Sequence, residues 1–146
     1  MIPAPNSQDS RKEIHRWRRT FPGTRNQIRQ ARRFAASYLT GHHEADTVQL
    51  IVSELATNAL RHTHSGQAGG HFHLTLYMGS QLLLLAVTDE GGPLTPHIQH
   101  TGTDQPNGRG LHLVAELTTR WGVYGDHHGR TVWALLPLTP PNPAAA

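Results

Sequence analysis

Three short stretches of this sequence place polar residues at spacings that suit chemistry. In the first, VSELATNALRH, Glu54, Asn58 and Arg61 recur at i, i+4 and i+7, which puts them on one face of a helix. Asparagine has low helix propensity, so its position in mid-helix calls for a reason. The three side chains project together next to the apolar stripe of the helix, and not opposite it, so they could hold a ligand. A solvated helix edge is the plainer interpretation of any single triplet of this kind.

The second stretch is VTDEGG, residues 87–92, directly after an apolar run. Asp89 is expected at the end of a strand, facing a turn made by Gly91 and Gly92. A carboxylate beside permissive backbone can accept a hydrogen bond from an exocyclic amine while the chain passes close to a ring. An ordinary Asp-Glu-Gly-Gly turn explains the stretch equally well when it is taken alone.

The third stretch is NGRGLHLV, residues 107–114, in which Gly108 and Gly110 lead into a predicted helix. Backbone N–H groups at a helix N-terminus form a site for anions, and glycines allow a phosphate to approach them. A lone Gly-x-Gly is a weak signal, so this stretch gains meaning only together with the other two.

The elements that must position these stretches follow from the hydrophobic pattern. We predict a strand, two helices, two strands, a long loop at residues 92–107, a helix and a closing pair of strands. Strands joined by tight turns indicate a mixed, mostly antiparallel sheet. The predicted fold is an α/β (α+β) sandwich with helices packed on one face of that sheet.

Composition bounds the possibilities further. The 146 residues contain no cysteine, which excludes disulfides and thiolate chemistry. No apolar run approaches the roughly 18 residues that span a bilayer, and no signal core is present, so we expect a cytoplasmic location. We predict a mobile arm at residues 1–14, one domain at 15–138 and a disordered Pro/Ala tail at 139–146.

The basic residues are unevenly placed. Nine of the thirteen Lys and Arg residues lie between Arg11 and Arg33. Such a segment can bind nucleic acid, but no aromatic stacking set accompanies the charge, so we favour an arm that continues into a helix with an arginine-rich outer face. His71 and His73 share one face of a predicted strand and could chelate a metal. Without a third ligand at a telling spacing, a structural or exposed role is favoured.

Taken in order, the three stretches resemble the GHKL ATP-binding fold. The matching motifs are ELATNALRH from Glu54, then Asp89-Glu90-Gly91, then Gly108-Arg109-Gly110-Leu111. Within that superfamily the chain is most similar to the bacterial anti-sigma factor serine kinases. The stretch SELATNALRH and the closing RWGV…GRTVWALL carry that similarity, which spans about residues 20–137.

The resemblance implies roles for the helix and strand-end residues. Asn58 would bind Mg²⁺ through its side-chain oxygen. Glu54, one helical turn earlier, would be the general base. Asp89 would accept a hydrogen bond from the adenine amino group, and Gly91 would let the backbone approach the base.

It also implies a phosphate-binding segment. Gly108 and Gly110 would wrap the phosphates, with Leu111 completing that nucleotide-binding motif. Arg61 and Arg109 are candidates for neutralising phosphate charge by their spacing and not by a motif. The only lysine, Lys12, lies in the predicted arm, so a Walker-type lysine is absent.

The implied activity is that of an ATP- and Mg²⁺-dependent protein serine kinase and anti-sigma regulatory factor. It would phosphorylate an anti-anti-sigma (STAS-type) partner, sequester a sigma factor and form a homodimer, without membrane contact or direct nucleic-acid binding. The family pattern D-x-G-x-G is broken by Pro93, which keeps open a non-catalytic, ATP-binding partner-switching module. A sensor histidine kinase is disfavoured, because too few residues precede the first helix for a phosphoacceptor hairpin.

Overall fold

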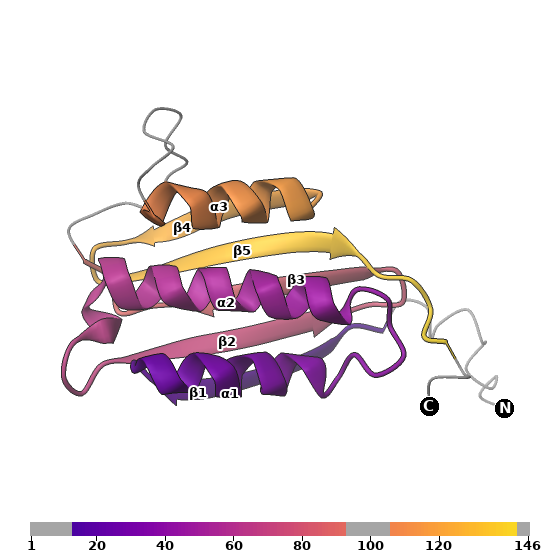
Figure 1. Ribbon diagram of the computed structural model, residues 1–146, viewed down its shortest axis with the longest axis horizontal. Helices are drawn as coiled ribbons and strands as arrows, with labels where there is room; N and C mark the ends of the chain where they lie inside the picture. Colours follow the sequence, from indigo (N-terminus) through magenta and orange to yellow (C-terminus); the bar gives the residue numbers. More distant parts are fainter. Residues whose placement is uncertain (1–12, 93–105, 143–146) are drawn as a thin grey trace, which may run out of the picture.

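The computed structural model describes residues 13–92 and 106–142. Its centre is a five-stranded sheet in the order β1-β2-β3-β5-β4, and all four neighbouring pairs are antiparallel. The helices lie against one face of this sheet (Figure 1). The predicted two-layer α+β fold is therefore confirmed, with one change: the described strands form a wholly antiparallel sheet and not a mixed one.

The order of elements agrees with the hydrophobic pattern. Their bounds are β1 (His15–Pro22), α1 (Arg25–Ala36), α2 (Ala45–His62), the 3-10 helix η2 (His64–Gly66), β2 (His71–Met78), β3 (Leu82–Thr88), α3 (Pro106–Leu117), β4 (Arg120–Asp126) and β5 (Gly129–Pro137). Helix α3 begins earlier than predicted, because proline suits the first helical position, where an N–H is not needed. Gly108 and Gly110 consequently lie inside α3 and not ahead of it.

The core lies between the helices and the sheet. Alternate residues of the central strands point to the same side, and the register pairs Leu74 with Val87 and Leu76 with Leu85. These side chains are buried, and they belong to one cluster with the apolar stripe of α2, which includes Ile51 and Leu55. Burying this stripe fixes the rotation of α2 and so decides where its polar residues point.

The opposite face of the sheet carries no helix among the described residues. Tyr77, Leu84 and Trp133 lie there, and a hollow of about 510 Å³ opens beside Tyr77 and Leu84. Three large apolar side chains on or beside this open face are exposed, namely Ile14 (68 %), Leu82 (51 %) and Tyr124 (62 %). This open face is therefore a surface on which a partner could bury apolar area.

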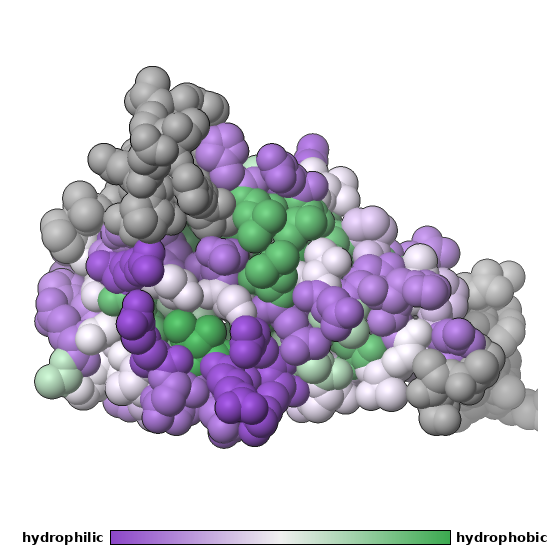
Figure 2. Space-filling model, in the orientation of Figure 1, coloured by the Kyte–Doolittle hydropathy of each residue, from purple (hydrophilic) through white to green (hydrophobic). Residues whose placement is uncertain are grey.

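The helical side of the molecule is divided by polarity. Hydrophilic side chains gather over α1 (Figure 2), whose Arg25, Arg29, Arg32 and Arg33 are all exposed. The arginine-rich outer face predicted for this helix is thus present. A hydrophobic area lies over α2 and α3 in the same view. Leu50 of α2 is 41 % exposed. None of the helices in the described ranges has both the length and the apolar character needed to cross a bilayer.

The segment after β5 is held against the loop between α1 and α2. The Thr139 backbone N–H donates to Glu44 Oε1 at 2.8 Å, and the Thr139 hydroxyl donates to Oε2 at 3.1 Å. The Asn142 N–H donates to the Gly41 carbonyl at 2.8 Å. Residues 139–142 of the predicted tail therefore make ordered contacts. Residues 1–12, 93–105 and 143–146, which include most of the predicted arm and loop, lie outside the described residues.

Candidate functional site

Asp89 lies one residue beyond the end of β3 and extends its pairing with β5. Its N–H donates to the Arg130 carbonyl at 2.8 Å. Its Oδ1 accepts from the Gly91 N–H at 2.6 Å and from the Arg130 N–H at 3.3 Å. Both N–H groups thus use the same oxygen, and within the described part of the chain no hydrogen bond is made to Oδ2. The side chain is 5 % exposed, so these two hydrogen bonds fix its orientation.

Asp89 is a buried carboxylate, and nearby N–H groups and a cation offset part of the cost of burying its charge. Burial raises its pKa above the ordinary value of 3.8, and the Gly91 hydrogen bond and the positive charge of Arg130 oppose that rise. Two N–H donors and a cation favour the ionised form, while burial disfavours it. A carboxylate in this setting is a strong acceptor for an amine that enters the site.

The two glycines after Asp89 form a turn that only glycine fits. Gly91 has φ +81°, and a Cβ there would lie 2.1 Å from the His127 carbonyl oxygen. A Cβ on Gly92 would lie 2.9 Å from the His62 carbonyl oxygen. The Gly91 carbonyl also accepts from the His64 N–H at 2.8 Å. The turn is therefore packed between the β4–β5 turn and the C-terminal end of α2.

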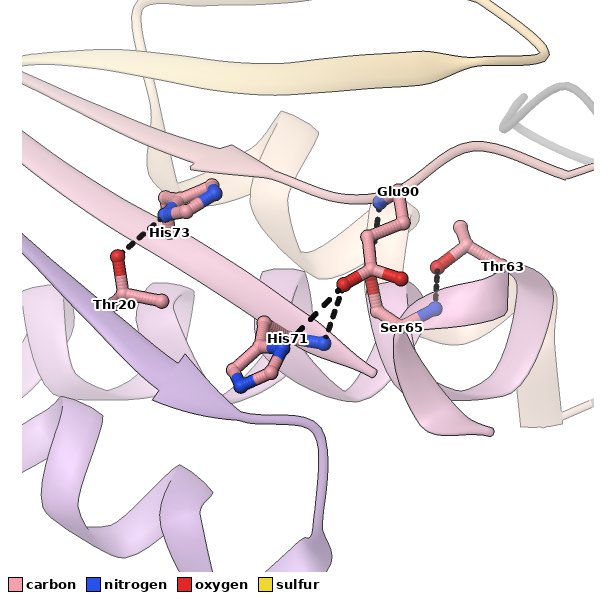
Figure 3. A network of polar contacts seen from close by, with 6 residues as sticks. All are labelled: Thr20, Thr63, Ser65, His71, His73 and Glu90. Atoms are coloured by element: carbon pink, nitrogen blue, oxygen red, sulfur yellow. Dashed lines mark hydrogen bonds and ion pairs between the residues drawn. The ribbon is translucent and has the colours of Figure 1, made fainter. Parts of the chain in front are cut away.

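The short helix η2 ties this turn to α2. Thr63 donates its hydroxyl to the Ala59 carbonyl at 2.6 Å and accepts from the Ser65 N–H at 3.1 Å. Ser65 in turn accepts, through its hydroxyl oxygen, from the Glu90 N–H at 2.9 Å. Part of this chain of contacts is drawn in Figure 3. Because Glu90 directly follows Asp89, these bonds fix the position of Asp89 relative to the last turn of α2.

The side chain of Glu90 makes a second link, to β2. Its Oε1 accepts from the His71 backbone N–H at 2.7 Å and lies 3.7 Å from His71 Nδ1 (Figure 3). His73 instead contacts the Thr20 hydroxyl at 2.6 Å. Across the described residues there is no group of three or more His, Cys, Asp or Glu side chains that could hold a metal. The two histidines therefore have separate polar partners.

The polar face of α2 runs from Glu54, in the middle of the helix, to the C-terminal turn that borders the Asp89 turn. Asn58 is 9 % exposed, and its Nδ2 is buried without a hydrogen-bond partner. Glu54 is half-buried and Arg61 is exposed. Asn58 precedes His62, whose carbonyl borders Gly92, by one helical turn. A buried amide with an unmet partner is unfavourable in the absence of a ligand, so this helix face is a candidate for a ligand-binding surface.

Helix α3 packs beside α2, and its first turn lies at the end of the molecule where α2 finishes (Figure 1). Gly108, Arg109 and Gly110 lie in that part of α3. Leu111 is 2 % exposed and belongs to the core cluster. Leu111 can therefore affect the site only by packing α3 against the core. The role of Arg109 stays a prediction from sequence.

The residues at this end fit a nucleotide with a divalent cation. The Asp89 turn offers a fixed acceptor beside backbone that only glycine allows. The amide oxygen of Asn58 and the carboxylate of Glu54 are hard oxygen donors. Mg²⁺ is usually held by one or two such protein oxygens together with phosphate oxygens and water.

Comparison with known proteins identifies the domain. Residues 21–136 match the family described as the histidine kinase-like ATPase domain. The chain belongs to this family. No curated protein matches the sequence. The match covers all three predicted motifs, and the histidine kinase-like ATPase domain is the GHKL type to which they were assigned. Membership supports ATP binding and kinase-like use of ATP.

Sequence reasoning missed two residues of this ATPase domain's candidate site. Ser65 lies in the stretch HSGQAGG, which reads only as the end of a helix. Arg130 opens the apolar strand RTVWALL, and a charged residue next to a turn looks unremarkable there. The available signal was the pairing of the two central strands, since a strand that follows the turn DHHG can place Arg130 opposite Asp89.

Proposed function

We propose that this ATPase domain is an ATP- and Mg²⁺-dependent protein serine kinase of the anti-sigma regulatory type. One observation carries the proposal: the buried carboxylate of Asp89 and the unpaired amide of Asn58 lie at one end of the molecule, joined through the last turn of α2. Asp89 carries the cost of a buried carboxylate, and Asn58 carries the cost of a buried N–H donor without an acceptor. A bound nucleotide would relieve both costs by offering an amino group to Asp89 and an oxygen acceptor to Asn58 Nδ2.

At the adenine end, Asp89 Oδ2 would accept a hydrogen bond from the exocyclic amino group. Guanine presents a carbonyl oxygen at the equivalent position, so an ionised carboxylate would repel it. The Gly91–Gly92 turn would bring backbone close to the ring, because no side chain stands in the way.

At the phosphate end, Asn58 would hold Mg²⁺ through its amide oxygen, and the bound metal would supply charge neutralisation at the phosphate oxygens. Arg61 and Arg109 would add positive charge. The free backbone N–H groups in the first turn of α3, including that of Gly108, would donate hydrogen bonds to phosphate oxygens, and Gly110 would leave room for the phosphates to approach. Phosphoryl transfer depends mainly on positioning and charge neutralisation, which this set of groups would provide.

Glu54 would act as the general base. As the serine oxygen of the partner bonds to the γ-phosphorus, the bond from that phosphorus to the ADP oxygen breaks. The serine proton passes to the Glu54 carboxylate, and ADP leaves with the bonding electron pair. Glu54 is half-buried on α2, one turn before Asn58, which is a suitable place for a base beside the phosphates.

The test compares Glu54→Gln with the unchanged protein, using radiolabelled ATP and a panel of STAS-type proteins as acceptors. We expect serine phosphorylation of one acceptor, a loss of at least about a hundredfold in rate for Glu54→Gln, and unchanged ATP affinity by calorimetry. Tight ATP binding without phosphorylation of any acceptor would show that the kinase assignment is wrong.

A second candidate is an ATP-binding module that switches partners without transferring phosphate. Pro93 favours it, because proline lacks an N–H and fixes φ in the segment that follows the Gly91–Gly92 turn. The two candidates differ in the rate of transfer and not in ATP affinity. Measurable phosphorylation that disappears in Glu54→Gln would exclude the non-catalytic module.

The proposal extends to an anti-anti-sigma protein as phosphoacceptor and a sigma factor as the alternative partner, with ATP favouring one of them. It also includes a homodimer, for which the open face of the sheet offers exposed Leu82 and Tyr124. Light scattering of the unchanged protein should give twice the monomer mass, and Leu82→Asp should reduce it. A monomer at every concentration would remove the homodimer from the proposal.

A further inference from the structure

Arg130 is a buried cation in an unusual setting. It is the second residue of β5, it is 3 % exposed, and its Nη2 donates to the Gly92 carbonyl at 2.8 Å. Its Nε is buried without a hydrogen-bond partner. The same residue pairs with Asp89 through its backbone N–H and carbonyl. Arg130 thus contacts both the carboxylate-bearing residue and the turn that follows it.

Stability alone does not account for this arginine. Within the described ranges no carboxylate oxygen lies within ion-pair distance of it. A buried guanidinium that makes no ion pair is costly, and an apolar side chain of similar size is often more favourable. The Arg130 charge nevertheless acts on its surroundings, since it opposes the rise in the pKa of Asp89 and, after burial and Arg61, helps to lower the pKa of His62.

We propose that Arg130 is a positioning residue for adenine recognition: its guanidinium holds the Gly92 carbonyl, and so holds the Gly91 N–H in place against Asp89 Oδ1. Because the hydrogen bond from Gly91 holds Oδ1, the orientation of Oδ2 in the site is fixed. This inference rests on the proposed nucleotide site and adds a residue that sets its selectivity. Arg130 does not touch the base; it acts through Asp89 and the turn.

The consequence is a difference between purines. Adenine offers an amine to Oδ2, while hypoxanthine offers a carbonyl oxygen, so a fixed carboxylate favours ATP over ITP. Without the Arg130 contact the turn and the carboxylate can move apart, and the preference should fall. A residue that only supported the fold would change the affinities for the two nucleotides by the same factor.

The experiment measures Mg²⁺-dependent binding of ATP and ITP by calorimetry to the full chain and to three variants. They are Arg130→Met, Arg130→Lys and, as a matched control on the exposed strand β4, Arg120→Met. We expect Arg130→Met to weaken ATP about tenfold or more and to change ITP less, so that the ATP:ITP ratio falls. Arg130→Lys should restore part of the ratio, and Arg120→Met should leave it unchanged.

Equal losses for both nucleotides, or no loss, would overturn the inference. If the unchanged protein binds neither nucleotide, the proposed function itself fails, which is a distinguishable result. Should Arg130→Met not fold, amide hydrogen exchange of Gly91 in Arg130→Lys decides the matter. Faster exchange than in the unchanged protein would support the positioning role, and an equal rate would contradict it.

Discussion

One carboxylate lies at the N-terminal end of α2 and another lies beside its C-terminal end. Their pKa values are shifted in opposite directions. Glu44, at the N-terminal end, is half-buried and accepts two hydrogen bonds from Thr139. Asp89, beside the C-terminal end, is almost completely buried. Partial burial by itself would raise the pKa of Glu44. The hydrogen bonds from Thr139, the hydrogen bond from the backbone N–H of Glu44 itself and the nearby His42 together outweigh burial and lower that pKa. Burial dominates at Asp89 and raises its pKa.

The contrast separates a structural contact from a candidate binding group. A lowered pKa means that ionised Glu44 stabilises the folded chain, in keeping with its role in holding residues 139–142 against the α1–α2 loop. A raised pKa means that ionised Asp89 destabilises it. Groups kept at a cost to stability are concentrated at functional sites, so the nucleotide end should lose function when changed, and the tail end should lose only stability.

The largest effect expected at the nucleotide end is that of Gly91→Ala. The positive φ and the clash with the His127 carbonyl should lower the free energy of unfolding by about 3 kcal/mol or more. The matched control is Gly69→Ala, where φ is +79° and nothing lies within 4 Å of the added Cβ. It should cost only about 1 kcal/mol. Urea denaturation of both variants measures the difference, and equal costs would show that the turn is not tightly packed.

The next effect is on ligand binding. Asp89→Asn keeps an oxygen for the Gly91 N–H but turns an amide donor toward the adenine amine. We expect ATP affinity to fall about a hundredfold, with no loss of thermal stability because a costly buried charge is removed. Glu44→Gln, at the other end of α2, should bind ATP normally. If calorimetry finds that Glu44→Gln also weakens ATP, the two ends are coupled and the comparison fails.

A smaller effect is expected from the tail contact. Thr139→Ala removes the hydroxyl bond to Glu44 Oε2 and keeps the backbone bond to Oε1. This should cost about 0.5 to 1 kcal/mol in the free energy of unfolding and leave nucleotide binding intact. Thermal denaturation reports the loss. An unchanged melting temperature would mean that residues 139–142 add nothing to stability.

The smallest effect is the change in the free energy of unfolding with pH. Its sign differs between Glu44 and Asp89, which lie at opposite ends of α2. Ionised Glu44 contributes stability above pH 4.5, and this contribution disappears as the pH falls through its lowered folded-state pKa. Ionised Asp89 lowers stability at neutral pH. That penalty is relieved as the pH falls through its raised folded-state pKa towards 3.8.

The unchanged protein should therefore lose its stability advantage over Glu44→Gln on acidification. It should close its stability deficit relative to Asp89→Asn as the pH falls through the raised folded-state pKa of Asp89 towards 3.8. Chemical denaturation as a function of pH measures both differences. If acidification favoured the unchanged protein over both variants, or disfavoured it relative to both, the pKa shifts of Glu44 and Asp89 would be contradicted.

Local sequence signals were enough for the elements and for the three motifs. The stripe from Ile51 to Leu55 and the alternation from Phe72 to Leu76 each predict an element from burial periodicity alone. The fold class and the family followed correctly from them. The start of α3 was misjudged, because glycines read as a loop although Pro106 can begin a helix ahead of them.

The sequence by itself determined which face of α2 carries Glu54, Asn58 and Arg61, and that Asp89 ends an apolar strand before two glycines. Helical and strand periods are local properties, so a pattern of residue types is sufficient for such statements. Only the tertiary structure decided that Arg130 lies beside Asp89, that Ser65 ties the turn to α2 and that Glu44 holds Thr139. Those contacts join residues 25 to 95 positions apart. Strand pairing and packing set them, and no short window of sequence contains both partners.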